Sequence, residues 1–410
     1  MVLDRWQTSG DRGGETATSR PGSVRTDAWR TTMTGRIVLL GATGFTGRLT
    51  AERMVRRGLR PLLVARDPAR LAPLAERLGE LGELETRRAD VTEPGALKSV
   101  LGPGDVLVST VGPFVRLGHA AVTAAIEAGA WYFDSCGEAP FIREVFERYG
   151  AAAERAGVGL VPGFGYDYVP GNLAGALALE AAGPAAVRVD TGYFVTGGTP
   201  GPALMTPGTA ASLVGCLLEP GFTWRDGELR ADPAGARTRR FPLPTGRSLA
   251  MSLGGSEHLA LPRSYPRLRE VNVYLGWFGE TTRLLSLTAA AFPALARVPG
   301  VKPAFARLSR RLAGSSIGPD PIAVDTIRSH VVGLALDESG AVLAESHLRG
   351  PNGYPITGSL LTWASERAAD GGLRATGALG PIEAFGLAEL RSAAALAGLV
   401  EWVREPRDSR

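Results

Sequence analysis

The sequence predicts an α/β protein with a doubly wound parallel sheet, together with a second α+β domain built on a mixed or antiparallel sheet. A glycine-rich turn between an apolar strand and a helix at 36–47, and the strand–helix alternation after it, predict the first part. From about Val187 every second residue suits a half-buried antiparallel strand, which predicts the second part. The 410 residues, 44% of them hydrophobic, are enough for two cores.

The first strand and its turn read Arg-Ile-Val-Leu-Leu-Gly-Ala-Thr-Gly-Phe-Thr-Gly at 36–47. Its apolar residues are consecutive, as in a parallel strand that is buried on both faces. The three glycines remove side chains where backbone approaches a pyrophosphate, and the next helix offers its free N–H groups to that anion. We therefore expect a Rossmann-type dinucleotide site with contacts from Gly41, Thr43, Gly44, Phe45, Thr46 and Gly47.

Short Gly, Pro and Asp connections separate the βα units that follow. We expect further strands at 61–65, 84–89, 105–111, 131–134 and 158–161, and helices at 48–57, 68–78, 94–101, 117–128, 141–156 and 172–179. With the first strand these make the six strands of a Rossmann-type doubly wound sheet.

In the second part of the chain we expect strands at 187–195, 248–253, 270–275, 327–336 and 342–348, with a hairpin turn at 337–340 and a helix at 207–218. The predicted domains are a disordered tail (1–34), an NADP-binding domain (35–183), a substrate and dimerisation domain (184–350) with a helical insertion (281–312), and C-terminal helices (351–410). Two of these helices, at 359–369 and 385–399, are expected to pack back on the first domain.

Composition excludes several classes of protein. The net charge of +4 is small and its positive residues are interspersed with acidic ones, so nucleic acid is not indicated. No apolar stretch reaches the ~20 residues of a membrane span. Cys136 and Cys216 lack the spacing of a disulfide framework or a zinc site, so we expect no metal and a cytoplasmic protein.

Cofactor choice depends on the end of the second strand, where an NAD site would carry Asp or Glu and this chain carries Arg66. A guanidinium group can bind a 2′-phosphate bidentately, so NADP(H) is the expected cofactor, although Asp67 could still reach a ribose. After the third strand, Asp90 and Val91 are expected beside the adenine. After the fourth, we expect four residues beside the nicotinamide ribose: Thr110, Val111, Gly112 and Pro113.

The turn at 163–171 should bring Tyr166, Asp167 and Tyr168 near the nicotinamide as candidate catalytic residues. A tyrosine, or a partly buried carboxyl group with a raised pKa, can protonate a developing enolate. Asp167 could equally be a helix cap, and the two tyrosines an aromatic wall. Glu138 could be catalytic, ribose-binding or a helix-start carboxylate, while a structural role is favoured for His258.

Four motifs, at 41–47, 109–114, 132–138 and 162–170, together resemble the saccharopine dehydrogenase-like oxidoreductases, in particular the branch named trans-acting enoyl reductases. The resemblance implies a Rossmann domain interrupted by a substrate domain with a mixed sheet, NADP(H) as hydride carrier, and a homodimer in some members. Tyr168 stands where a small residue such as serine is more usual, which implies a reshaped substrate pocket.

Two functions follow as hypotheses. The first is an NADPH-dependent reductase of an activated C=C or C=N bond in a mostly apolar small-molecule intermediate of biosynthesis, either free or linked to a carrier or lipid. The second is an NADP(H)-binding sensor or scaffold protein without turnover. The lack of an unmistakable catalytic acid in the sequence supports this hypothesis.

Overall fold

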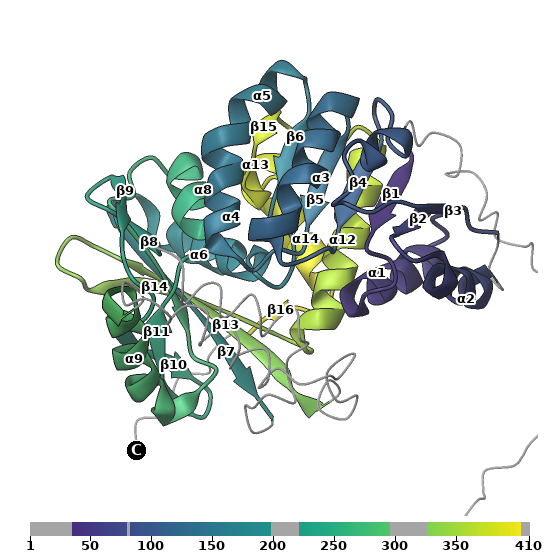
Figure 1. The fold of residues 1–410 in the computed structure, drawn as a ribbon. Coiled ribbons are helices and arrows are strands. Elements are labelled where there is room, and N and C mark those ends of the chain that lie inside the picture. Colours follow the sequence, from purple (N-terminus) through teal and green to yellow (C-terminus); the bar gives the residue numbers. More distant parts are fainter. Residues whose placement is uncertain (1–34, 80–82, 198–220, 296–325, 403–410) are drawn as a thin grey trace, which may run out of the picture. The chain divides into compact units, whose positions relative to one another are not determined.

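The computed structural model describes residues 35–79, 83–197, 221–295 and 326–402 (Figure 1). Thr34–Arg410 forms one compact unit that contains two sheets. The predicted tail, the predicted helix at 207–218 and the end of the predicted insertion lie outside the described residues. The predicted domain limits stay predictions.

The first sheet has seven parallel strands in the order β15-β6-β5-β4-β1-β2-β3. They are β1 (Ile37–Leu40), β2 (Leu62–Ala65), β3 (Thr86–Arg88), β4 (Val106–Ser109), β5 (Trp131–Asp134), β6 (Gly159–Val161) and β15 (Gly377–Ala378). The central strands β1, β2 and β4 are buried at every position, which explains why all their residues except Ser109 are apolar. The predicted Rossmann-type doubly wound sheet is confirmed, with β15 as an added edge strand.

The helices between these strands are α1 (Phe45–Arg56), α2 (Pro68–Gly79), α3 (Phe114–Ala128), α4 (Ala139–Glu144), α5 (Gly150–Arg155) and α6 (Val169–Ala182). The helix predicted at 94–101 is wrong: only a 3-10 turn, η1 (Ala96–Ser99), forms there, because Gly95 takes a left-handed φ of 76° and residues 102–104 already form the next turn. The single helix predicted at 141–156 is interrupted by a π-helical turn at Val145–Tyr149.

Within the described residues the second sheet has nine strands, ordered β10-β11-β12-β7-β13-β14-β16, with β8 paired to β12 and β9 paired to β8. They are β7 (Arg188–Thr196), β8 (Phe222–Arg225), β9 (Glu228–Ala231), β10 (Thr238–Leu243), β11 (Gly246–Ser252), β12 (Glu270–Leu275), β13 (Arg328–Leu336), β14 (Val342–Gly350) and β16 (Val400–Glu401). Among the strands of the described residues in this sheet, only β7 and β12 pair in parallel, so the predicted mixed sheet is confirmed. Short 3-10 turns lie at Gly183–Ala185 and Gly279–Thr281.

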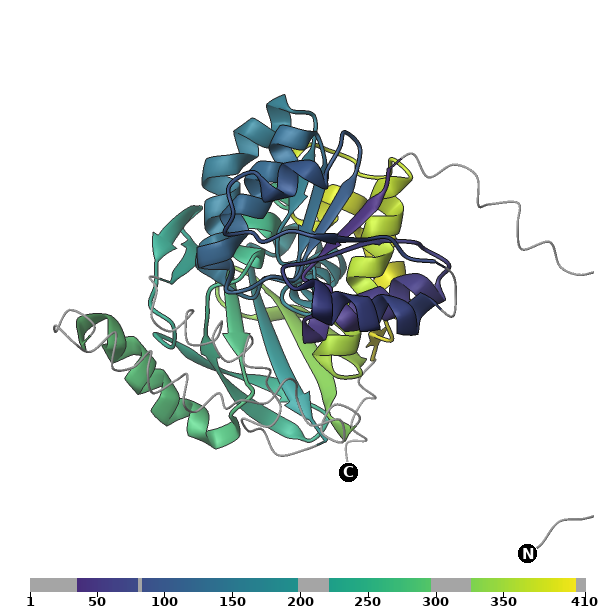
Figure 2. The same cartoon turned by 45° about the vertical axis from the view of Figure 1, so that its right-hand side comes forward.

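Five further helices lie in this part and in the C-terminal part: α8 (Glu257–Ser264), α9 (Thr282–Leu295), α12 (Gly353–Ala369), α13 (Pro381–Phe385) and α14 (Leu387–Leu396). Helix α12 packs against α1, β4 and β5, and α1 and α12 lie side by side in both ribbon views (Figures 1 and 2). Helix α6 packs against β7, β13 and β14 and so joins the two sheets. Its N-terminus follows directly after the motif at 163–168.

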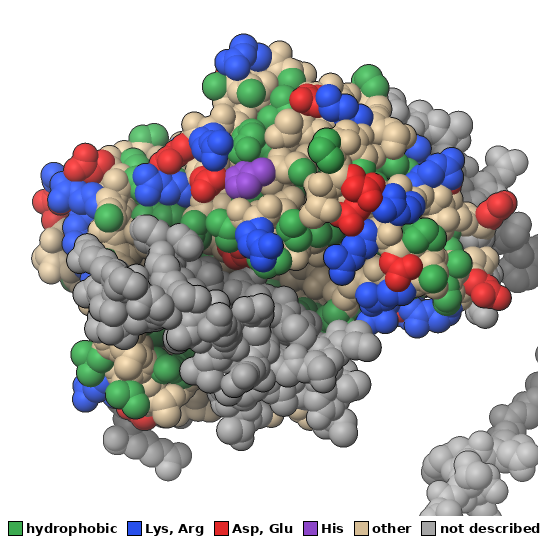
Figure 3. Space-filling model, in the orientation of Figure 1, with side chains coloured by type: hydrophobic (Ala, Val, Ile, Leu, Met, Phe, Trp, Pro, Cys, Tyr) green, Lys and Arg blue, Asp and Glu red, His purple; other side chains and the backbone are tan. Residues whose placement is uncertain are grey.

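Charged side chains of both signs are interspersed on the described part of the face in Figure 3. Within the described ranges, no helix combines the length and the apolar character that a bilayer crossing requires.

Candidate functional site

The glycine turn lies between β1 and α1. Gly41 has φ of 85°, which favours glycine, and a Cβ on Gly47 would lie 2.2 Å from the Gly41 carbonyl oxygen. Gly44 is the exposed N-cap of α1; it makes no side-chain cap, and the first turn of α1 carries no acidic residue. The helix N-terminus therefore offers its N–H groups and positive dipole end to an anion, as a pyrophosphate site requires.

Thr110, at the end of β4, closes this turn from the neighbouring strand. Its hydroxyl lies 3.1 Å from the Leu40 carbonyl oxygen and 3.2 Å from that of Gly41, and can donate to either. Val111 also packs here: its Cγ2 would lie 2.8 Å from a Cβ at Gly41. Gly112 is exposed, and Pro113 is the N-cap of α3. The neighbouring strands β1 and β4 thus end side by side at the carboxyl-terminal end of the sheet, where the sequence predicts the cofactor.

Arg66 follows β2 directly and is exposed, with no ion pair or hydrogen bond to the described part of the chain. Hydrogen bonds from the Thr92 N–H and hydroxyl lower the pKa of the Asp90 carboxyl. The positive charge of Arg66 lowers this pKa by a smaller amount, so Arg66 lies near Asp90. Asp67 accepts from the Ala69 N–H at 3.0 Å and so caps the start of α2. This geometry leaves Arg66, rather than Asp67, available to a ligand.

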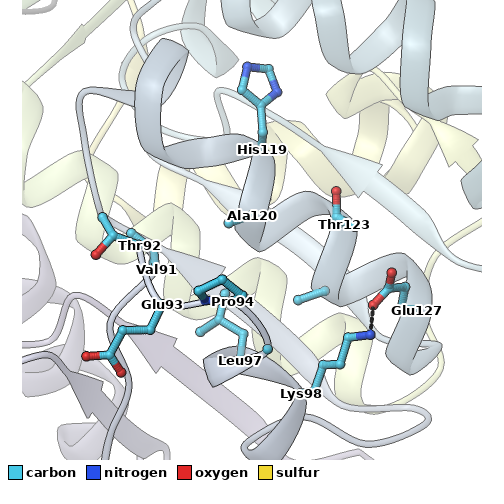
Figure 4. A pocket seen from close by; sticks show the side chains of 12 residues that line it. Val91, Thr92, Glu93, Pro94, Leu97, Lys98, His119, Ala120, Thr123 and Glu127 are labelled. Atoms are coloured by element: carbon cyan, nitrogen blue, oxygen red, sulfur yellow. Dashed lines mark ion pairs between the residues drawn. The ribbon is translucent and has the colours of Figure 1, made fainter.

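Val91 lines a cavity of about 450 Å³ between the segment after β3 and helix α3 (Figure 4). Its walls include Pro94 and Leu97, and the Lys98–Glu127 ion pair of 2.7 Å lies at one side. The ring of His119 points away from Pro94 and Leu97 in this view. The cavity therefore adjoins the position expected for the adenine, and its wall combines apolar residues with polar and charged ones.

The motif at 163–168 connects β6 to α6 and carries the three candidate catalytic side chains. Asp167 is partly buried, makes no hydrogen bond to any described residue, and lies beside Gly137: a Cβ there would be 3.2 Å from its Oδ2. Burial raises the pKa of Asp167 to about 6. Its carboxyl is therefore free to act on a ligand, and part of its population carries a proton near neutral pH.

The two tyrosines of the motif differ from each other. The Tyr166 ring is buried, and this burial raises the pKa of its hydroxyl well above the usual range, while the nearby Ser329 side chain lowers that pKa by a smaller amount. The Tyr168 hydroxyl lies 2.7 Å from the Gly137 carbonyl oxygen and 3.2 Å from that of Gly254, so it donates to backbone. Tyr168 thus fastens the loop after β5 to the loop before α8 and is a positioning residue.

Beneath this motif lies a buried pair that the sequence did not single out as functional. Glu257, at the start of α8, is fully buried and accepts at 2.7 Å from the hydroxyl of Tyr193 on β7. The Tyr193 oxygen in turn accepts from the Gly171 N–H in the first turn of α6. Burial, with a smaller contribution from the charge of Asp167, raises the pKa of Glu257 to about 8. The two carboxyl groups are therefore electrostatically coupled.

Two other carboxyl groups hold the loops at the strand ends in place. Asp134, at the end of β5, accepts from the backbone N–H groups of Cys136 (2.9 Å) and Gly163 (2.7 Å), and burial raises its pKa to about 6. Glu138 is buried and accepts from the N–H groups of Phe114 and Val115 at 2.9 and 3.0 Å. Of the roles left open for Glu138, its geometry fits the helix-start carboxylate, here for α3.

His258 also has a structural environment. It is buried, its Nδ1 lies 3.1 Å from the Gly255 N–H nitrogen, and burial lowers its pKa to about 3. The neutral ring packs edge-on against Phe222. The structural role favoured from the sequence fits these contacts.

Comparison with known proteins identifies the family. A family model described as the saccharopine dehydrogenase NADP binding domain matches residues 37–161. A protein of Mycobacterium tuberculosis (strain ATCC 25618 / H37Rv), provisionally named a trans-acting enoyl reductase, is 32% identical over 285 residues, covering 65% of this chain and 67% of that protein. The chain belongs to the saccharopine dehydrogenase-like oxidoreductases, in the trans-acting enoyl reductase branch.

Two further comparisons agree with this membership. The trans-acting enoyl reductase of Mycobacterium ulcerans (strain Agy99) is 36% identical over 140 residues, covering 33% of this chain and 34% of that protein. The apo saccharopine dehydrogenase (L-Glu forming) of Saccharomyces cerevisiae matches 90% of this chain and 99% of its own, with a TM-score of 0.54 and 15% identity, and so shares the fold. The predicted family, fold class and NADP(H) cofactor are thus confirmed for this oxidoreductase.

Proposed function

We propose that this NADP-dependent oxidoreductase reduces an activated C=C bond, or alternatively a C=N bond, in a mostly apolar small-molecule intermediate. The observation that carries the proposal is Asp167, next to the strand ends of a dinucleotide-binding sheet. It is partly buried, makes no hydrogen bond to the described residues, and has a pKa raised to about 6. A group of this kind can hold a proton near neutral pH and give it to a developing carbanion.

The proposed cofactor contacts divide by chemistry. The N–H groups after Gly44 would hold the pyrophosphate, Arg66 the 2′-phosphate, and Val91 the adenine, while Thr110 and Val111 would border the nicotinamide ribose. Thr43, Phe45, Thr46, Asp90, Gly112 and Pro113 complete the proposed set. When bound, NADPH supplies the hydride, so the protein itself must orient the substrate and provide a proton.

Three side chains of the motif at 163–168 would serve the proton transfer. Asp167 is the proposed proton donor, and Tyr166, its neighbour in the chain, is the alternative donor. Tyr168 would fix the Gly137 loop beneath Asp167 through its backbone hydrogen bonds. The buried pair of Glu257 and Tyr193 would influence the electrostatic potential at Asp167.

Several finer properties belong to the same proposal. The substrate is either free or attached to a carrier or lipid, the protein acts in the cytoplasm, and the second sheet contributes to a homodimer. The alternative of a sensor or scaffold without turnover is not favoured, because curated relatives are named as reductases.

The experiment that tests the function follows NADPH oxidation at 340 nm with a 2-enoyl thioester, a 2-enoyl amide and a cyclic imine of matched chain length. We expect turnover with one of the unsaturated acyl substrates, and its loss in Asp167→Asn. Tight NADPH binding with no oxidation by any of the three classes would support the sensor hypothesis.

A further inference from the structure

A second cavity, lined in part by arginines, lies away from the glycine turn. It is formed where the C-terminal end of α1 meets α12 and α14. Its volume is about 210 Å³, and its walls include Arg53, Arg56 and Arg57 of the α1 end, Ser359 and Trp363 of α12, and Leu396 of α14. Arg53 lies eight residues after Phe45, which is about 12 Å along the helix axis at 1.5 Å per residue. The cavity is therefore separate from the proposed pyrophosphate position.

The arginines of this cavity carry more positive charge than their neighbours balance. Arg57 pairs with Glu366 at 2.7 Å. Arg53 and Arg56 make no ion pair and no hydrogen bond within the described part of the chain, and the Nε of Arg53 is buried without a partner. The nearby carboxylate of Glu52 pairs with Arg77 at 2.7 Å, and its charge raises the pKa of Arg53 by less than burial and Arg56 lower it.

Burial and the charge of Arg56 both lower the pKa of Arg53, which shows that the two like charges act on each other in a partly desolvated place. The stem of Arg53 lies against the α12 backbone: a Cβ at Gly358 would be 3.3 Å from its Cδ and 3.4 Å from its Nε. Basic residues in the last turn of a helix are favoured by the helix dipole. That effect explains Arg56, at the exposed end, better than it explains the buried Nε of Arg53.

The rest of the cavity is suited to the apolar part of a ligand. Trp363 is nearly buried and fixed by ring contacts with Phe164 (6.4 Å) and Phe385 (4.6 Å). Leu396 is 68% exposed at the rim and so offers apolar surface to a ligand. The hydroxyl of Ser359 makes no hydrogen bond within the described residues and can donate to an oxyanion.

We propose that this cavity binds a small organic anion, a carboxylate attached to a short apolar chain. The two unpaired guanidinium groups would hold the carboxylate, since their planar forks match its two oxygens, and the chain would lie between Trp363 and Leu396. A volume of about 210 Å³ accepts a group of this size and is too small for a nucleotide. This inference does not depend on the reductase activity.

The test is calorimetric titration of the full-length protein, in the presence of saturating NADPH, with hexanoate and with inorganic phosphate. We expect one saturable hexanoate site, bound at least about tenfold more weakly by Arg53→Gln and by Arg56→Gln, on the scale of losing a charge-assisted hydrogen bond. Arg283→Gln, an exposed arginine on α9, is the matched control and should leave the affinity unchanged.

A further variant does not depend on the folding of the arginine mutants. Leu396→Asp changes an exposed position, so the fold should tolerate it, and its carboxylate should repel the ligand and weaken hexanoate binding by a similar factor. Absence of saturable hexanoate binding, or equal affinity in all four variants, would overturn the proposal. Phosphate binding as tight as that of hexanoate would overturn the assignment of an apolar chain.

Discussion

Glu257→Gln should change how the stability of the protein depends on pH. The side chain is fully buried, with a pKa raised from 4.5 to about 8 because burial penalises its charged form. The folded state thus holds a proton that the unfolded state releases between pH 4.5 and 8, so the stability contributed by this group falls as pH rises through that window. A shift of about 3.5 pKa units, at 1.36 kcal/mol each, corresponds to roughly 3 to 6 kcal/mol of the free energy of unfolding. The protein has lost this stability once the pH is above 8.

A glutamine cannot ionise and retains an oxygen for the Tyr193 hydroxyl, which lies 2.7 Å from Oε1 in the native protein. We therefore expect Glu257→Gln and the native protein to have similar free energies of unfolding at pH 5, and the variant to be more stable by several kcal/mol at pH 9. Urea titrations at both pH values measure the difference, in which the other titrating groups cancel. Glu76→Gln, at an exposed position on α2, is the control and should show no pH-dependent difference. A Glu257→Gln difference that stays constant from pH 5 to pH 9 would refute the reasoning.

Three more predictions concern the proposed site. Arg66→Ala should weaken NADPH binding by about 1.5 to 3 kcal/mol and leave NADH binding almost unchanged, as fluorescence titration would show; equal losses for both cofactors would exclude a 2′-phosphate contact. Asp167→Asn should lower turnover at least about a hundredfold and leave the NADPH affinity unchanged. In the native enzyme, turnover should decline as the pH rises above 6, because Asp167 then loses its proton. Gly47→Ala should destabilise the fold by roughly 1 to 3 kcal/mol, seen as a lower melting temperature, because its Cβ would lie 2.2 Å from the Gly41 oxygen; an unchanged melting temperature would show that the turn can move.

The parts of the fold that the sequence predicted well are those with a local cause. The strand and turn at 37–47 combine consecutive apolar residues with glycines whose positions are fixed by sterics, and β12 was predicted with its bounds at 270–275. Strands β8, β9 and β10 were missed because arginine, glutamate and proline interrupt their alternation, and β9 is largely exposed. Helix α8 was missed because Pro262 lies inside it.

The candidate site was harder to predict, because its chemistry depends on burial by distant segments. Glu257 precedes His258 in a sequence that gives no sign that α6, β7 and α8 surround its carboxyl group. Arg53 has the ordinary pattern of a basic residue near a helix end, and only the approach of α12 at Gly358 buries its Nε. Desolvation of this kind is a property of the packed chain, so periodicity and motif spacing do not report it.

The choice of proton donor among three consecutive residues shows how the structure narrows a prediction. The Tyr168 hydroxyl already donates its proton to backbone carbonyls. A proton from Tyr166 would leave a phenolate in a buried place where the pKa is raised well above the usual range, so that transfer is opposed by the same desolvation. The pKa of Asp167, at about 6, lies near neutral pH, where an acid can both hold its proton and release it. Asp167 is also the one of the three that is not fully buried, and it makes no hydrogen bond within the described residues, which makes it the best matched of the three.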